Sequence, residues 1–437
     1  MHRRGTIALL LTALMAALLC GCGRMASFPE QGASDPGVPT QDAIEREDLK
    51  IVIASDLHYL APELTDRGAY FWRVMENGDG KVTEYCEEIL DAFVQDLLAD
   101  PPAAVVLTGD VSFNGALESH RALAAKLEQL EAAGIAVLIL PGNHDVFRSS
   151  SAAFFGDGYE LRETATSESF REVYTAYGYD EALSRDESSL SFVARLDSHT
   201  RAMLLDADTL HDFCSLSPDT LAWVDAQLED AERAGERTLV FCHQNLYQHS
   251  MFRAGYVLDC ADALHDLLEK HHVPLFFSGH MHIQHILTQG GVTEICTSPL
   301  TMGECRYGIL RVSGETLRYE TRPVDVAAWA ASQGVENEDL LQFHDYALES
   351  MARRTRSEAE GYLSGRLPEG EEQKTMVDYA VALNLAYFAG DLTDIPALDP
   401  EGALLKGWEE SGTMFGFYFA SIREEIGMDY CHWEGNW

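Results

Sequence analysis

Five apolar runs in this sequence end in the same way, each at a small group of polar residues that can hold a metal ion. The tightest group is Pro141-Gly142-Asn143-His144-Asp145, which follows the apolar run 135–140. Apolar runs of this length, bounded by Gly and Pro, indicate buried strands, and open α/β sheets place their sites at the carboxyl ends of strands. We therefore expect Asn143 to bind a metal and His144 to act on a substrate. Taken alone, Asn-His-Asp could also be an ordinary turn.

The other four groups extend this pattern along the chain. They are Asp56-Leu57-His58 after the run 49–55, Gly109-Asp110 after 103–108, His243 after 238–242, and Gly279-His280-Met281-His282 after 274–278. Residues two apart in an extended chain point the same way, so Asp56 and His58 can bind a single ion. Two imidazoles at the same spacing, His280 and His282, can bind metal as neutral nitrogens.

Segments with helical spacing separate these strands and define the fold class. In the segment 84–99 apolar residues recur every three or four positions, which predicts a helix with one face on a sheet. Strands that alternate with such helices predict βαβ units and a largely parallel sheet. The runs 191–196 and 202–205 indicate paired strands. In this α/β fold His120, His243 and His249 could each be a packed core histidine rather than a ligand.

The first residues indicate export from the cell. A basic start at 1–4 precedes an apolar stretch at 7–19, which is shorter than the roughly 20 residues that span a bilayer. This arrangement predicts a signal peptide at 1–21. The sequence Leu19-Cys20-Gly21-Cys22 resembles the lipobox of bacterial lipoproteins and favours lipidation of Cys22, with ordinary secretion as the alternative. Residues 22–47 predict a flexible tether, so we expect a protein on the bacterial cell surface, anchored to the membrane by lipid.

The charge and the cysteines limit the possible partners and bonds. The formal net charge is −40, so most of the surface would repel a polyanion. This argues against a long nucleic acid as a partner, although a small phosphate ester could bind where metal ions reverse the local field. Seven cysteines follow Cys22 without a CxxC pair, which favours buried free thiols.

Taken in order, the groups DxH, GD, GNHD, H and GHxH resemble the calcineurin-like metallophosphoesterase superfamily over about residues 49–322. The resemblance implies an α/β domain at 48–325, built as a β-sandwich flanked by helices. It also implies a site for two metal ions, divalent or of mixed valence. One ion would be held by Asp56, His58 and His282, the other by Asn143, His243 and His280, with Asp110 bridging both. Mixed oxygen and nitrogen ligands fit manganese, iron or zinc.

The same resemblance implies the hydrolysis of phosphate esters. A hydroxide that bridges the two metals would attack phosphorus, and two ions about 3.5 to 4 Å apart suit such a displacement. His144 would donate a hydrogen bond or a proton near the leaving oxygen. Asp145 would support the imidazole or the loop.

The details of the motifs favour one branch of this superfamily. Protein phosphatases carry an arginine-bearing GDxVDRG, whereas this chain has Gly109-Asp-Val-Ser-Phe-Asn-Gly115, and the charge disfavours the nuclease branch. The chain most resembles class III cyclic nucleotide phosphodiesterases of the secreted Gram-positive lipoprotein type, which implies phosphodiester substrates, with Asn114 near the phosphate. The alternatives are a broad-specificity phosphomonoesterase and a noncatalytic surface binding protein. The second is disfavoured because every expected ligand position is filled.

Residues 326–437 carry no comparable motif. Apolar residues recur at helical spacing near 340–351 and 376–387, which predicts a small helical C-terminal subdomain. We expect it to pack on the catalytic domain, or to help form a dimer or a substrate rim. The pattern leaves the oligomeric state open.

Overall fold

Two mixed β-sheets form the centre of this computed structural model, which describes residues 48–78, 80–209 and 214–437. The first sheet has the strand order β15-β14-β13-β1-β2-β3. Its strands are β1 (Leu49–Ala54), β2 (Ala104–Thr108), β3 (Ala136–Leu140), β13 (Arg306–Ser313), β14 (Thr316–Pro323) and β15 (His432–Asn436). The signal peptide, the tether and Cys22 lie outside the described residues and stay predictions.

The second sheet has the strand order β11-β12-β10-β9-β8-β7-β6. Its strands are β6 (Ser184–Arg185), β7 (Phe192–Arg195), β8 (Thr200–Leu205), β9 (Arg237–Cys242), β10 (Leu275–Ser278), β11 (His285–Gln289) and β12 (Val292–Cys296). The antiparallel pair β7 and β8 matches the two strands predicted at 191–196 and 202–205. A separate hairpin joins β4 (Ala152–Phe155) to β5 (Gly158–Leu161).

Parallel pairing brings the polar groups of the sequence to shared sheet edges. Strands β1, β2 and β3 run parallel, with Ile51 opposite Ala104 and Val105 opposite Val137. Strands β8, β9 and β10 are also parallel to one another. Ser55, just beyond β1, forms a bridge with Pro299, just beyond β12, so the two sheets meet near these strand ends. The residues that follow β1, β2, β3, β9 and β10 can therefore converge.

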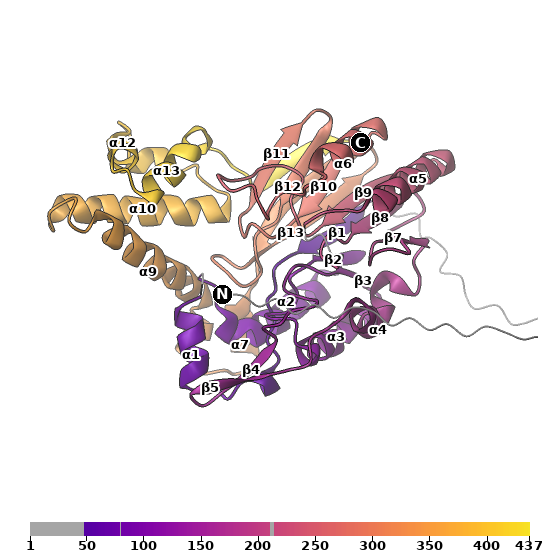
Figure 1. The fold of residues 1–437 in the computed structure, drawn as a ribbon, viewed down its shortest axis with the longest axis horizontal. Helices are drawn as coiled ribbons and strands as arrows, with labels where there is room; N and C mark the ends of the chain where they lie inside the picture. The colour runs from indigo at the N-terminus through magenta and orange to yellow at the C-terminus, as the bar shows by residue number, and fades with distance from the viewer. Residues whose placement is uncertain (1–47, 79, 210–213) are drawn as a thin grey trace, which may run out of the picture. The chain divides into compact units, whose positions relative to one another are not determined.

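The side chains of the second sheet alternate between two apolar clusters. In β9, Leu239 and Phe241 belong to the core that both sheets share, whereas Val240 and Cys242 belong to a second cluster on the opposite face. Helices α5 (Pro218–Ala234) and α6 (Ala261–Lys270) supply Leu228 and other residues to this second cluster and lie outside the sheet (Figure 1). A strand that is buried on both faces has no polar alternation, which explains the continuous apolar run at 238–242.

Helices α2 (Cys86–Ala99) and α3 (Leu117–Ala132) lie beside β1, β2 and β3 (Figure 1). Both bury an apolar face in the shared core, α2 through Ile89 and Phe93, α3 through Leu123 and Leu127. Two shorter helices, α1 (Ala69–Glu76) and α4 (Ser167–Val173), belong to the connecting segments. The predicted β-sandwich flanked by helices is confirmed.

The C-terminal region is mostly helical: its first helices pack in the core that the sheets share, and its later helices have a core of their own. Its helices are α7 (Val326–Ser332), α8 (Glu338–Leu341), α9 (Phe343–Leu363), α10 (Glu371–Ala389), α11 (Ile395–Leu398), α12 (Ala403–Glu410) and α13 (Met414–Ser421). Leu383, Trp408 and Phe419 pack in this core together with Ile283, which directly follows a predicted metal ligand. The end of α10 is also bonded to the catalytic part, because the Tyr387 hydroxyl donates to the His249 carbonyl at 2.8 Å.

Strand β15 was not anticipated from the sequence. It pairs antiparallel with β14, with Tyr319 opposite Trp433, and so extends the first sheet. Residues 432–436 are His-Trp-Glu-Gly-Asn and alternate between exposed and half-buried positions. A short, largely polar strand at a sheet edge has no apolar run by which it could be recognised.

The structure also bears on three smaller points: the role of His120, the state of the cysteine thiols, and whether a helix could span a membrane. His120 is buried and bonds the Asp145 carbonyl at 2.9 Å and the Tyr174 hydroxyl at 3.0 Å, which is the geometry of a packed core histidine. The seven cysteines among the described residues are free, and all except Cys260 are buried. In this described part of the chain, no helix has both the length and the apolar character needed to cross a membrane.

Candidate metal centre

Six of the seven predicted metal ligands form two groups of converging donor atoms. One group contains Asp56, His58 and His282, and the other contains Asp110, His243 and His280. Within each group one donor atom per residue lies within 4.8 Å of the others. The donors come from the ends of four strands, β1, β2, β9 and β10.

The first group has the geometry of an ion site. His58 Nε2 and His282 Nε2 face each other at 3.3 Å, and His282 Nε2 is 3.2 Å from Asp56 Oδ1. Asp56 Oδ1 is fully buried and has no well-aligned hydrogen bond among the described residues. The other carboxylate oxygen, Oδ2, accepts from the Ser55 hydroxyl at 2.7 Å and from the His280 backbone N–H at 3.0 Å. A buried carboxylate with one oxygen aimed at two imidazoles fits a cation.

The second group is oriented by hydrogen bonds to main-chain carbonyls. His243 Nδ1 donates to the Thr108 carbonyl at 2.9 Å, which directs Nε2 toward Asp110 Oδ2 at 3.3 Å and Asn143 Oδ1 at 3.2 Å. His280 Nε2 donates to the Gly255 carbonyl at 2.8 Å, so its Nδ1 keeps the lone pair for a cation. A hydrogen bond made by the ring nitrogen that does not face the metal fixes the tautomer and the orientation of a ligating histidine.

Asp110 lies between the two groups. Besides its neighbours in the second group, it forms a third cluster with His58 and His144. Its Oδ1 accepts from the His144 backbone N–H at 2.6 Å. A ligand shared by two ions has to occupy such a central position. The complete donor set, with carboxylate, amide and imidazole atoms, is compatible with manganese, iron or zinc.

The electrostatics of the centre favour anionic carboxylates. Burial raises the pKa of Asp110, but His243 and His144 together hold it well below its usual range. Burial likewise opposes ionisation of Asp56, yet His282 keeps its pKa below the usual value. Burial and the neighbouring His243 lower the pKa of His280 to about 4. His243 differs, because burial lowers its pKa but the nearby carboxylates of Asp110, Asp56 and Asp208 together raise it to about 10, so a cation that binds there has to displace a proton.

The backbone of the centre is strained at the ligands themselves. Five of them have a positive φ although none is glycine: Asp56 (52°), His58 (43°), Asp110 (47°), His280 (67°) and His282 (58°). Non-glycine residues adopt this conformation at a cost of about 1 to 2 kcal/mol each, and such residues concentrate at functional sites. Here the conformation turns the chain sharply where a strand ends.

The glycines of the motifs allow close packing around the ligands. A Cβ atom at Gly142 would lie 2.3 Å from the Asp110 backbone nitrogen and 2.4 Å from Asp110 Oδ1. A Cβ at Gly279 would lie 2.7 Å from Asp56 Oδ2. Gly109 has φ +94°, and a Cβ there would meet the His243 ring at 2.7 Å. Each glycine therefore makes room for a ligand that belongs to another segment.

Replacing Gly142 by alanine is expected to displace Asp110 and to lower both metal content and stability. The added Cβ meets the Asp110 backbone nitrogen, which cannot rotate away, as well as the Asp110 carboxylate and the His243 ring, and overpacking of this kind costs about 1 to 3 kcal/mol. Calorimetric unfolding and elemental analysis of the purified variant measure both effects. The control is Gly361→Ala in α9, where a Cβ meets nothing within 4 Å and helix propensity predicts a gain of about 1 kcal/mol. Metal content equal to that of the wild type in Gly142→Ala would contradict the packing argument.

His144 and Asp145 take different positions beside the ligands. His144 Nδ1 donates to the Phe113 carbonyl at 2.9 Å, and its ring lies 4.9 Å from the His58 ring. Its Nε2 is thus the nitrogen available for a substrate. Asp145 is fully buried and accepts from the backbone N–H groups of Val111, Ser112 and Gly142 at 2.8 to 3.1 Å. It fastens the loop after β2 to the loop after β3.

Asn114 lies outside the clusters of metal-binding residues. Its side-chain N–H donates to the Ala152 carbonyl at 2.9 Å, and its Oδ1 has no hydrogen bond within the described part of the chain. The observed contact holds the hairpin of β4 and β5 to the loop after β2. A role for Asn114 near the phosphate therefore stays a prediction.

Glu294 in β12 is a residue of the site that the sequence analysis missed. It is fully buried, and its carboxylate accepts from the Ser278 hydroxyl at 2.6 Å and the Leu246 N–H at 2.9 Å. It also lies 2.9 Å from His249 Nε2, which makes His249 part of this buried network. The network ties the segment after β9 to the end of β10, next to His280. Its signal in the sequence is an acidic residue within the short strand-like segment Val292-Thr-Glu-Ile-Cys296.

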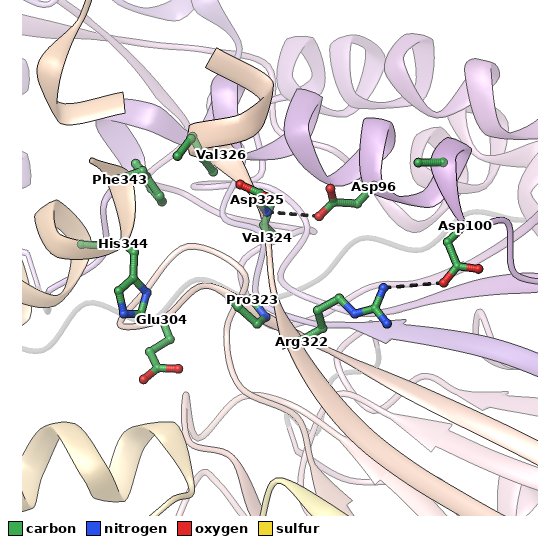
Figure 2. A pocket seen from close by; sticks show the side chains of 13 residues that line it. Asp96, Asp100, Glu304, Arg322, Pro323, Val324, Asp325, Val326, Phe343 and His344 are labelled. Carbon is green, nitrogen blue, oxygen red and sulfur yellow. Dashed lines mark hydrogen bonds and ion pairs between the residues drawn. The ribbon is translucent and has the colours of Figure 1, made fainter. Parts of the chain in front are cut away.

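A pocket lies apart from the metal centre, between α2, β14, α7 and α9 (Figure 2). None of the clustered ligands lines it. Its carboxylates already have partners, because Asp96 accepts from the Asp325 N–H at 3.1 Å and Asp100 pairs with Arg322 at 3.6 Å. The metal centre is therefore the better candidate for chemistry.

Comparison with known proteins identified two family models. The calcineurin-like phosphoesterase model matches residues 49–284, and the model of the C-terminal domain of cyclic nucleotide phosphodiesterase matches residues 325–426. No curated protein matches the chain.

Two solved structures are similar to this chain at low sequence identity. A dimetal phosphatase from Danio rerio is 15% identical, with a TM-score of 0.46 over 63% of this chain and 96% of that chain. A purple acid phosphatase from yellow lupin (Lupinus luteus) seeds is 14% identical, with a TM-score of 0.45 over 66% of this chain and 52% of that chain.

Proposed function

Because the chain belongs to the calcineurin-like phosphoesterase family, we propose that it hydrolyses phosphodiesters, with cyclic nucleotides as the preferred substrate class. The observation that carries the proposal is the convergence of carboxylate and imidazole donors into two groups with Asp110 between them. The preference for cyclic nucleotides is supported by the match of residues 325–426 to the C-terminal domain of cyclic nucleotide phosphodiesterase.

The protein residues have separate tasks in this reaction. Two bound cations would lower the pKa of a water molecule and offset the charge of the phosphate. Asp56, His58 and His282 would hold one cation, and Asn143, His243 and His280 the other. Asp110 would contact both. The main-chain carbonyls of Thr108 and Gly255 keep two of the imidazoles in the ligating orientation.

His144 is placed to assist the leaving group. Its Nδ1 proton is committed to the Phe113 carbonyl, so its Nε2 carries a proton only when the ring is cationic. The protonated Nε2 would then donate to the leaving oxygen of the ester.

Hydrolysis is expected to require metal and to favour diesters. The purified protein supplied with manganese should hydrolyse bis-p-nitrophenyl phosphate faster than p-nitrophenyl phosphate, and should cleave 2′,3′- or 3′,5′-cyclic nucleotides. Removal of metal by EDTA should abolish the activity, and manganese should restore it. The measurements are release of p-nitrophenol and chromatography of the nucleotide products.

The same panel separates the alternatives. A folded, metal-loaded sample that hydrolyses none of these compounds would exclude the enzyme proposal and favour a binding protein. Faster hydrolysis of the monoester would replace the diesterase with a broad-specificity phosphomonoesterase.

A further inference from the structure

A row of aromatic rings leads outward from the metal centre. The Tyr256 ring lies 5.0 Å from the ring of His280, with an angle of 41° between the planes. The Phe252 ring lies 6.2 Å from that of Tyr256, at 36°. Both aromatic residues belong to the segment between β9 and α6. The row therefore starts at a metal ligand and ends at Phe252.

The segment that carries these rings is held firmly against the centre. The Asn245 N–H donates to the Tyr256 carbonyl at 3.0 Å, and the Tyr256 N–H donates to the Arg253 carbonyl at 3.1 Å. The Gly255 carbonyl accepts from His280 Nε2 at 2.8 Å. Tyr256 is thus positioned by main-chain bonds through both its N–H and its carbonyl, and the residue before it, Gly255, is bonded to the predicted metal ligand His280.

The outer end of the row is exposed to solvent. Phe252 is 48% exposed, and Tyr256 is half-buried. Leaving a large apolar side chain in water forgoes the free energy that its burial would provide. Single exposed apolar side chains are common, so it is the place of Phe252 in the row that begins at His280, rather than its exposure alone, that makes it a candidate for contact with a ligand.

The charge of this segment suits an anionic ligand. Between β9 and α6 the chain has one cation, Arg253, and one carboxylate, Asp259, whereas the whole chain has 71 Asp and Glu against 31 Lys and Arg residues. Arg253 is exposed beside Phe252. An anionic phosphate ester bound beside Phe252 therefore has a cation in the same segment.

We propose that Phe252 and Tyr256 form a stacking platform for the planar base of a nucleotide whose phosphate lies at the metal centre. The inference rests on the proposed function and adds the part of the substrate that the centre itself does not contact. In a nucleotide, one sugar separates the phosphate from the base, so a base can reach rings that begin next to a metal ligand. Aromatic side chains accept any base, because every base has a π-face. The platform favours nucleotides over aliphatic phosphodiesters without selecting one base.

The test compares ligands with and without a base. The manganese-loaded protein is titrated calorimetrically with adenosine monophosphate and with ribose 5-phosphate. Adenosine monophosphate should bind the wild type more tightly. Phe252→Ala should weaken adenosine monophosphate binding about tenfold and leave ribose 5-phosphate binding unchanged. It should also raise KM for cyclic nucleotides with kcat largely kept.

Two matched variants control for indirect effects. Phe417→Ala removes an even more exposed ring (61%) from α13 and should change neither affinity. Tyr256→Phe keeps the ring and should retain the preference for adenosine monophosphate. Equal affinity of the wild type for the two ligands would overturn the platform. So would an effect of Phe252→Ala on both ligands alike, or on neither.

The outcomes separate the platform from the enzyme proposal. A protein that prefers adenosine monophosphate through Phe252 but hydrolyses no phosphate ester would retain the platform and lose the proposed activity. A protein that hydrolyses diesters without any preference for a base would retain the activity and lose the platform.

Discussion

Replacing Asp110 by alanine is expected to reduce hydrolysis by at least about a thousandfold and to lower the amount of bound metal. Asp110 lies between the two groups of ligands, at 3.3 Å from His243 Nε2 and in a cluster with His58 and His144. Removal of its carboxylate therefore takes a ligand from both ion sites at once. Elemental analysis gives the metal content, and the rate with bis-p-nitrophenyl phosphate gives the activity.

The variant Asp110→Asn separates the charge of this residue from its shape. The amide keeps an oxygen of similar position but loses the negative charge, so it should also lose activity and metal. Full metal content and near-normal activity in Asp110→Ala would rule out a bridging role.

Replacing His144 by alanine is expected to lower kcat by about 10² to 10⁴-fold while most of the bound metal is kept. The variant removes Nε2, the candidate donor to the leaving oxygen. It keeps the His144 backbone N–H that donates to Asp110 at 2.6 Å, so the shared ligand stays in position. Steady-state kinetics and elemental analysis on the same preparation measure the two effects.

A histidine far from the centre provides the control. His199 is exposed in the segment before β8, and His199→Ala should leave both kcat and metal content unchanged. His144 belongs to a cluster that could itself hold a metal ion. If His144→Ala loses as much metal as Asp110→Ala, then His144 is a ligand and the division of roles is wrong.

The sequence predicts the strand ends well because their pattern is local. A buried parallel strand needs a continuous apolar run, and the polar group after it marks where the run leaves the core. The runs before Asp56, Asp110 and Asn143 became β1, β2 and β3 in one sheet, with neighbouring strands in contact. The spacing of the motifs does not show which of the two metal ions each ligand would bind. That assignment came from the resemblance to the calcineurin-like metallophosphoesterase superfamily.

Other features depend on contacts between distant segments, so the sequence could not reveal them. The positive φ values at the ligands follow from the turns that bring two sheets together. The carbonyls of Thr108 and Gly255 orient histidines far along the chain, and every residue has such a carbonyl, so nothing in the sequence marks these two. Strand β15 is recognised only by its partner β14.

Strand β15 also determines how the helices α7 to α13 could be transferred from one related protein to another. Because β14 and β15 are neighbours in one sheet, the helices α7 to α13 lie in the chain between two strands of the catalytic part. The helical region is thus an insertion rather than a terminal extension, and both of its ends are fastened to the same sheet. Transfer of this region between related proteins requires two junctions, and a single cut after β14 would leave the outer edge of that sheet unpaired.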